Sequence, residues 1–226
     1  MKRTVTIPGP PALEGIYETP DAPIRGNAVV SHPHPLYGGT MVNPVVHHVA
    51  KACRRQGLAT VRFNFRGVGS SEGTYQGTDE WRDVGAAAEF VAHQAAGGSP
   101  LILAGYSFGA RMSMLAALNG VSAHALILVA FPLMWEHLTP EAFDHIGDFR
   151  GPVLSILGQH DDVAPPEQVK AFFGDRGLEA ESVLIGGTDH FFYDHHEAVE
   201  AAVEDFLARV LPTPTPSTEM ARGEVE

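Results

Sequence analysis

One serine of this chain stands between two glycines at a spacing typical of a nucleophile. The segment "GYSFG", residues 105–109, fits the pattern G-x-S-x-G and directly follows the apolar run "LILA". A strand that turns at once into a helix puts its corner residue in an unfavourable backbone region. Side chains larger than hydrogen two residues to either side would collide with the neighbouring elements, which explains the glycines. The competing interpretation is a tight turn in which Ser107 is only the N-cap of a helix.

A serine hydroxyl attacks poorly unless a base takes its proton, and the base needs a third group to orient it. In strand–turn–helix proteins with this motif the chain order is Ser, then Asp or Glu, then His. Asp161 and Asp162 both follow the apolar run "PVLSILG", and we prefer Asp161 as the acid, with Asp162 capping the loop or tuning its neighbour. His190 follows the run "ESVLIGG" and is the expected base.

Other ionisable residues close to the expected base are interpreted as loop or surface residues. Asp189 is adjacent to His190 and must point elsewhere if His190 faces the site. His195 and His196 begin the last helical stretch, where surface exposure is expected.

Acyl transfer also needs two N–H donors for the negative charge that develops on the carbonyl oxygen. One is expected to be the amide of Phe108, directly after the serine. The other is expected from the segment "SHPHPLYGGTM", where Leu36 is the first residue with an N–H after His34 and Pro35. Tyr37 is the second choice for that donor, and its ring is alternatively a wall of the substrate pocket.

The dipeptide repeat "HPHP" raises the question of a metal site, because H-x-H occurs in binuclear metal hydrolases. That pattern wants an Asp-His pair shortly after it, and "LY" stands there instead. The two prolines are poor spacers for chelation, since their rings stiffen the backbone. We expect neither a metal nor a cofactor.

The elements that must position these residues alternate between strand and helix. Apolar runs predict strands at 4–7, 13–18, 27–31, 59–65, 100–106, 125–131, 152–158 and 181–187. Amphipathic stretches predict helices at 42–56, 79–95, 108–118, 166–173 and 197–210. The gaps hold the crossovers that parallel strands need, and helices on both faces explain the lack of polar alternation. The first two strands are too close for a crossover and predict an antiparallel edge.

The chain is expected to form one α/β domain over residues 1–211. Residues 212–226 are rich in Pro, Thr and Glu and are expected to be a disordered or loosely attached tail.

The formal net charge of −12 and the absence of an extended Lys/Arg run argue against nucleic-acid and membrane partners. The single cysteine, Cys53, excludes an intrachain disulfide and is interpreted as a structural thiol. With no signal-like segment, a cytoplasmic monomer or homodimer is expected.

Five segments together carry a family resemblance. "HPHPLYGGTM", "FNFRGVGSSEG", "GYSFGA", "GQHDD" and "DHFF" resemble the compact bacterial α/β-hydrolases related to dienelactone hydrolases and small carboxylesterases, over residues 26–195. The resemblance implies the α/β-hydrolase fold, with Ser107 as nucleophile, Asp161 as acid and His190 as base. It also implies an oxyanion hole at Leu36 and Phe108. Arg66, in the second segment, is interpreted as structural.

The chain departs from larger relatives of this family in its cap. Only the 20 residues 132–151 separate the apolar runs "ALILVAF" and "PVLSILG", which leaves room for one short helix. An open, shallow pocket with Phe131, Met134 and Trp135 as apolar walls is expected, and such a pocket favours small or short-chain acyl groups.

These observations predict a serine hydrolase that cleaves small carboxylic esters through an acyl-enzyme. The same three residues also suit a thioesterase, an amidase or an acyltransferase, which the sequence does not separate. A catalytically silent hydrolase fold that binds a ligand or a protein is the remaining alternative. Such proteins usually lack one member of the catalytic set, whereas all three candidates are present here.

Overall fold

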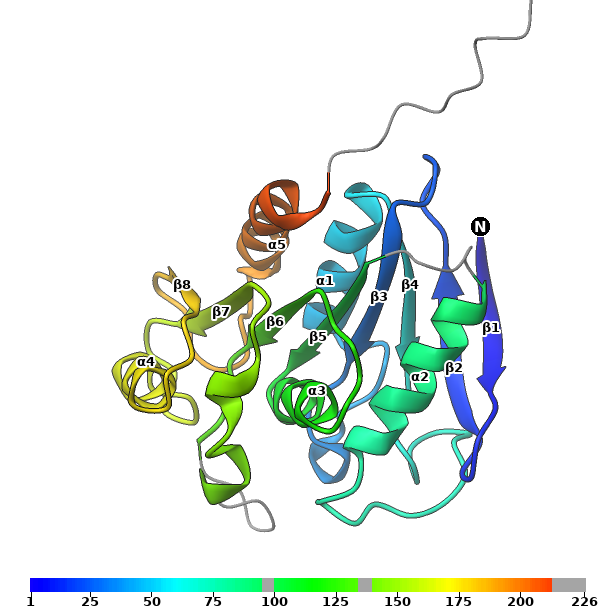
Figure 1. Ribbon diagram of the computed structural model, residues 1–226, viewed down its shortest axis with the longest axis horizontal. Coiled ribbons are helices and arrows are strands. Elements are labelled where there is room, and N and C mark those ends of the chain that lie inside the picture. Colours follow the sequence, from blue (N-terminus) through cyan, green and yellow to red (C-terminus); the bar gives the residue numbers. More distant parts are fainter. Residues whose placement is uncertain (95–99, 134–139, 213–226) are drawn as a thin grey trace, which may run out of the picture.

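The computed structural model describes residues 1–94, 100–133 and 140–212 (Figure 1). Its strands are β1 (Lys2–Ile7), β2 (Leu13–Glu18), β3 (Gly26–Ser31), β4 (Leu58–Phe63), β5 (Leu101–Tyr106), β6 (Ala125–Val129), β7 (Val153–Gly158) and β8 (Glu181–Ile185). Its α-helices are α1 (Pro44–Arg55), α2 (Trp81–Gln94), α3 (Phe108–Leu118), α4 (Pro166–Asp175) and α5 (His196–Val210). Short 3₁₀ turns occur at η1 (Pro35–Tyr37), η2 (Pro140–Phe143) and η3 (Ile146–Asp148).

The eight strands form one sheet in the order β1-β2-β4-β3-β5-β6-β7-β8. β2 runs antiparallel to both of its neighbours, β1 and β4. All other pairs are parallel. The prediction of a mostly parallel sheet with an antiparallel N-terminal edge is therefore confirmed. Because parallel strands end at the same edge, the loops after β3, β5, β7 and β8 meet there.

Helices cover both faces of the sheet, as predicted. α2 and α3 lie in front of the sheet and α1 lies behind it in Figure 1. α1 packs on β3 and β4 and against α5, whereas α3 packs on β5 and β6 and against α2. The two layers leave the central strands without a solvent-facing side.

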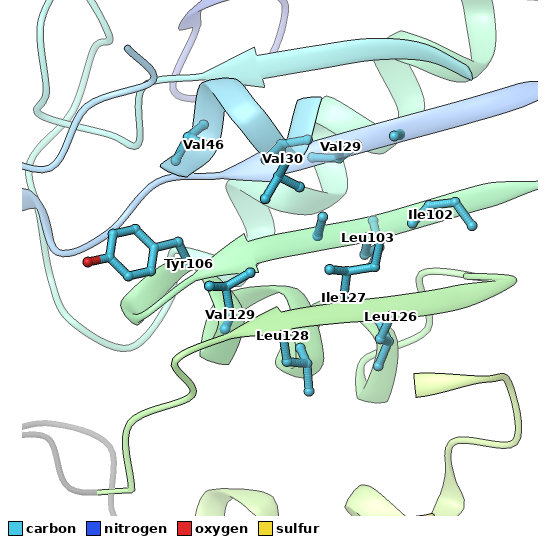
Figure 2. Packing of buried hydrophobic residues seen from close by; sticks show 14 of the residues in the cluster. Val29, Val30, Val46, Ile102, Leu103, Tyr106, Leu126, Ile127, Leu128 and Val129 are labelled. Atoms are coloured by element: carbon cyan, nitrogen blue, oxygen red, sulfur yellow. The ribbon is translucent and has the colours of Figure 1, made fainter. Parts of the chain in front are cut away.

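The core explains why the strands lack polar alternation. Every residue of β3, β4, β6 and β7 is buried. Side chains of β3, β5 and β6 fill the space on both sides of the sheet in Figure 2. Cys53 is completely buried, and burial raises the pKa of its thiol to about 12, which agrees with a structural thiol. No helix in the described residues is both long and apolar enough to span a membrane.

Between β6 and β7 the structure describes residues 130–133 and 140–152. In these residues the segment contains the two 3₁₀ turns η2 and η3 rather than an α-helix. Phe131 is not a pocket wall, because it is fully buried against Phe143 and Phe173 beneath this segment. Trp135 and Met134, the other expected walls, lie outside the described residues, as does the tail from residue 213 onward.

Candidate active site

Ser107 occupies a strained corner between β5 and α3. Its backbone has φ 53° and ψ −118°, a region that side-chain-bearing residues rarely adopt. Its amide donates a 2.8 Å hydrogen bond to the carbonyl oxygen of Val129, which fixes the corner to the end of β6. Ser107 occupies the N-cap position of α3, but its hydroxyl makes no capping bond to that helix and is left for another partner.

The two flanking glycines are required by close backbone approach. A Cβ on Gly105 would overlap the main chain of Gly109, the second residue of α3. A Cβ on Gly109 would overlap the carbonyl groups at the end of β3, including that of His32 at 2.6 Å. Any larger residue at either position would push α3 away from the sheet and move the hydroxyl of Ser107.

Ser107, His190 and Asp161 form a continuous hydrogen-bonded chain. The Ser107 hydroxyl lies 2.9 Å from His190 Nε2, and His190 Nδ1 lies 2.8 Å from Asp161 Oδ2. Because a carboxylate only accepts, Nδ1 carries the proton and Nε2 is left to accept from the hydroxyl. All three side chains are buried, so little water competes for these bonds.

The second carboxylate oxygen of Asp161 is held by its own loop. Asp161 Oδ1 accepts from the amide of Val163 at 2.9 Å and from that of Ala164 at 2.7 Å. With Oδ1 bound to the main chain, Oδ2 is directed at His190. Asp162, the alternative acid, is exposed, so the structure places Asp161 at the base as the sequence predicted.

The loops that carry Asp161 and His190 are joined by backbone hydrogen bonds beyond the sheet. The amide of Gln159 donates to Ile185 at 2.9 Å, and that of His160 donates to Thr188 at 2.9 Å. Tyr106 adds a third restraint, because its hydroxyl donates to the carbonyl oxygen of His190 at 2.8 Å. Sequence reasoning missed Tyr106, although it stands inside the serine motif.

The remaining ionisable residues near the base are directed elsewhere. Asp189 is exposed and accepts from the amide of Phe191 at 2.9 Å, as expected for a loop residue. His195 bonds the carbonyl oxygen of Tyr193, and the ring of His196 stacks on His48. Both histidines are half-buried rather than exposed, but neither is hydrogen-bonded to Ser107 or Asp161 in the described residues.

A cleft of about 590 Å³ opens beside Ser107 and His190. The loop after β3 lines it with Pro33, His34, Tyr37, Gly38, Gly39 and Asn43. The other lining residues are Tyr106, Val163, Phe191 and Tyr193. The volume lies within the range typical of small-molecule sites, about 300–1,000 Å³. Tyr37 therefore stands where a substrate-contacting residue was predicted.

The structure does not place Leu36 as the sequence predicted. Its side chain is 70% exposed, it does not line the cleft, and its amide donates to His34 Nδ1 at 3.1 Å. The amide of Tyr37, the second choice, donates to the carbonyl oxygen of His34 at 3.2 Å. Both N–H groups are used inside the η1 turn, so neither is aimed at Ser107. Phe108 differs, because the first residue of a helix has no intrahelical acceptor for its amide.

The histidines of "HPHP" use their ring nitrogens within the protein. His32 Nδ1 donates to the Pro33 carbonyl oxygen at 2.6 Å and Nε2 accepts from the amide of Phe65 at 3.0 Å. Burial lowers the pKa of His32 to about 4, so the ring is neutral at pH 7. His34 Nε2 bonds the hydroxyl of Tyr75 at 2.6 Å. No group of three metal-ligating side chains occurs within residues 1–94, 100–133 and 140–212.

Arg66 is structural, as predicted. Its guanidinium is buried against the carboxylate of Asp83, with Nη2 to Oδ1 at 2.6 Å. The amide of Arg66 donates to the same carboxylate at 3.0 Å. The pair ties the loop after β4 to α2.

Comparison with known proteins gives the class of this chain. The family described as alpha/beta hydrolase domain matches residues 33–211. The chain belongs to the α/β hydrolase family.

Several proteins are similar over most of the chain. A serine hydrolase homologue from Coxiella burnetii is 37% identical with a TM-score of 0.83, covering 91% of this chain and 97% of that one. XC6422 from Xanthomonas campestris, an α/β serine hydrolase without a lid, is 32% identical with a TM-score of 0.83, covering 95% and 97%. An uncharacterised protein of Rickettsia prowazekii is 30% identical over 204 residues, 88% of this chain and 85% of that protein.

Proposed function

We propose that this protein is a serine hydrolase that cleaves small carboxylic esters through an acyl-enzyme. The observation that carries the proposal is the buried chain of hydrogen bonds from Ser107 through His190 to Asp161, at a strained strand–helix corner beside a cleft. A strained backbone at the serine is characteristic of sites where reactive geometry is enforced by the fold.

The roles follow from the proton positions. Ser107 attacks the ester carbonyl while His190 Nε2 takes the hydroxyl proton. Asp161, already bonded to Nδ1, stabilises the imidazolium that forms. His190 then returns the proton to the leaving alcohol. In the second half-reaction His190 takes a proton from water as that water attacks the acyl carbonyl. It then returns the proton to Ser107 Oγ as the acid leaves, which regenerates the serine hydroxyl.

The oxyanion donors are assigned to two backbone amides. Phe108 supplies one, at the positive end of the α3 dipole. We assign the second to His34, the first residue after Pro33 that has an N–H, because His34 lines the cleft with Ser107. Removing one such donor typically costs about 3–4 kcal/mol of transition-state stabilisation.

Reaction with an active-site-directed probe tests the proposal. A fluorophosphonate is expected to label the wild-type protein and to leave Ser107→Ala unlabelled, and kcat for p-nitrophenyl acetate is expected to fall by roughly 10⁴–10⁶ in that variant. Ser182→Ala, which removes an exposed serine of β8, is the matched control and keeps full labelling. A folded wild-type protein that neither reacts with the probe nor turns over the ester contradicts the proposal.

The nature of the scissile bond is tested with the same protein. We expect ester hydrolysis to exceed amide hydrolysis, with water as the main acyl acceptor. Adding an alcohol or an amine to the assay and measuring the ratio of transfer product to acid separates a hydrolase from an acyltransferase. Transfer product in excess of acid at low acceptor concentration would assign acyl transfer instead.

A further inference from the structure

The loop that carries His190 presents two aromatic rings to the cleft. Phe191 and Tyr193 both line it and remain 53% and 69% exposed. Their rings are nearly parallel, with centroids 5.8 Å apart and an interplanar angle of 22°. Between them, Phe192 is completely buried and packs edge-on against Tyr106. One hydrophobic side chain anchors the loop and the two beside it face solvent.

The backbone of this loop is strained to achieve that arrangement. Phe192 has φ 54° and Asp194 has φ 61°, both in the left-handed region. A positive φ is a genuine outlier for a bulky residue and costs about 1–3 kcal/mol. Exposed aromatic rings also forgo burial, which would otherwise stabilise the fold. Two unfavourable features at one loop, directly beside the base, point to a binding role for the rings.

The position of the rings relative to His190 assigns them to one part of the substrate. His190 Nε2 must donate its proton to the leaving oxygen, so the alcohol part of an ester lies on the His190 side of Ser107. The ring of Phe191 lies 5.8 Å from that of His190, centroid to centroid, Tyr193 stacks on Phe191, and both line the same cleft. They therefore flank the alcohol part, whereas Tyr37 lines the cleft from the loop after β3.

The charges around the cleft restrict the substrate further. None of the described residues that line it is Lys or Arg, and the chain carries a formal net charge of −12. A bound carboxylate would lose water without gaining a cationic partner. The cleft is suited to an uncharged ligand.

On the basis of the function proposed above, we propose that the substrate is an uncharged ester whose alcohol part carries a planar aromatic ring, packed on Phe191 and Tyr193. The acyl part contacts neither ring and is free to be small.

A matched pair of esters tests this assignment. Benzyl acetate and cyclohexylmethyl acetate both release primary alcohols and differ in the planarity of one ring. We expect kcat/KM to favour the benzyl ester by about tenfold, as aromatic stacking beyond simple burial implies. In the double variant Phe191→Leu/Tyr193→Leu, which keeps apolar bulk without the rings, the ratio is expected to fall to near one. Leu184→Ala, an exposed apolar residue of β8, is the control and keeps the wild-type ratio.

Reversed esters separate the two sides of the cleft. Methyl phenylacetate and methyl cyclohexylacetate place the ring in the acyl part, and their kcat/KM ratio is expected to be the same in wild type and the double variant. Benzyl hydrogen succinate, an anion at neutral pH, tests the charge restriction. It is expected to release benzyl alcohol more slowly than its methyl ester does. Equal rates for the two acetates, or a ratio that survives loss of both rings, would overturn the assignment.

A binding measurement keeps this inference distinct from the proposed activity. Saturation-transfer NMR of benzyl acetate on Ser107→Ala is expected to show the phenyl protons in closest contact, and the signal is expected to be lost when the two Leu substitutions are added. Binding of this kind in a wild-type protein without turnover would refute the esterase and leave the aromatic subsite standing. Turnover without ring-dependent binding would refute the subsite alone.

Discussion

Tyr106 and His190 are joined by a 2.8 Å hydrogen bond from the phenolic hydroxyl to the main-chain carbonyl oxygen, although 84 positions separate them in the chain. Figure 2 shows the ring of Tyr106 projecting beyond the end of β5, toward the edge where the loops meet. Burial raises the pKa of Tyr106, so the hydroxyl stays protonated and able to donate. The residue before the proposed nucleophile thus holds the backbone of the proposed base.

Tyr106→Phe is expected to reduce activity by loosening His190. The substitution leaves a buried carbonyl oxygen without its donor, which costs about 1–3 kcal/mol of the free energy of unfolding. Small displacements of a catalytic group are expensive, so kcat for p-nitrophenyl acetate is expected to fall by about tenfold to a hundredfold. Urea denaturation and steady-state kinetics measure the two effects. A protein that loses stability but keeps wild-type kcat would show that the bond has no positioning role.

Asp161→Asn is expected to lower kcat by about 10⁴, because an amide in place of the carboxylate favours the wrong tautomer of His190 and cannot stabilise the imidazolium. The neighbouring Asp162 offers a matched control of the same chemistry in the same loop. It is exposed, and Asp162→Asn is expected to leave kcat within about twofold, as for surface substitutions generally. Similar losses in the two variants would contradict the assignment of the acid.

Gly109→Ala is expected to destabilise the fold, because the added methyl group overlaps carbonyl groups at the end of β3. Relieving the overlap requires movement of α3, and overpacking of this kind costs about 1–3 kcal/mol. Gly174→Ala is the matched control: nothing lies within 4 Å of the added Cβ there, and Ala favours the helix by about 0.5–1 kcal/mol. Urea midpoints that move in opposite directions support this account, whereas two equal shifts would contradict it.

Stability is expected to fall as the pH is lowered from neutral, in part because of His32. Burial lowers its pKa from 6.5 to about 4. Below pH 6.5 the unfolded chain therefore takes up a proton that the folded protein does not bind until about pH 4. The free energy of unfolding then decreases through this window, by about 3 kcal/mol at its lower end.

Denaturation midpoints between pH 7.5 and 4.5 measure this loss. His47 and His196 add to it in the same direction, since burial also lowers the pKa of each. In His32→Gln the dependence is expected to be shallower. A dependence identical to that of the wild-type protein would show that His32 does not contribute.

Most of the helices and strands can be predicted from the pattern of apolar residues in the nearby sequence. The helix expected at 108–118 and the strand expected at 13–18 have those bounds in the structure. Strands buried on both faces carry an unbroken apolar run, and their crossovers need a minimum length, so both leave a signal in a single sequence. The motif around Ser107 is only partly local: Gly105 responds to contact with α3 in the same turn, whereas Gly109 responds to the end of β3, far away in the chain.

Two predicted positions differ from the structure, Leu36 as an oxyanion donor and Phe131 as a pocket wall. Leu36 is the first residue with an N–H after two prolines, but the direction of that N–H depends on the turn, where it donates to His34 Nδ1. Phe131 was expected at the pocket, yet it packs under Phe143 and Phe173. The first outcome is decided by a turn geometry that residue types alone do not fix, and the second by packing partners from later segments of the chain.

Residue types and chain order were therefore enough to name Ser107, Asp161 and His190, since each follows a strand and parallel strands end at one edge. Which atoms meet at that edge was set by packing over long separations: the bond from Tyr106 to His190, the buried Phe192, and the outward rings of Phe191 and Tyr193. Hydrogen-bond direction and side-chain exposure depend on the whole surrounding structure, whereas backbone periodicity depends on the residue and its near neighbours.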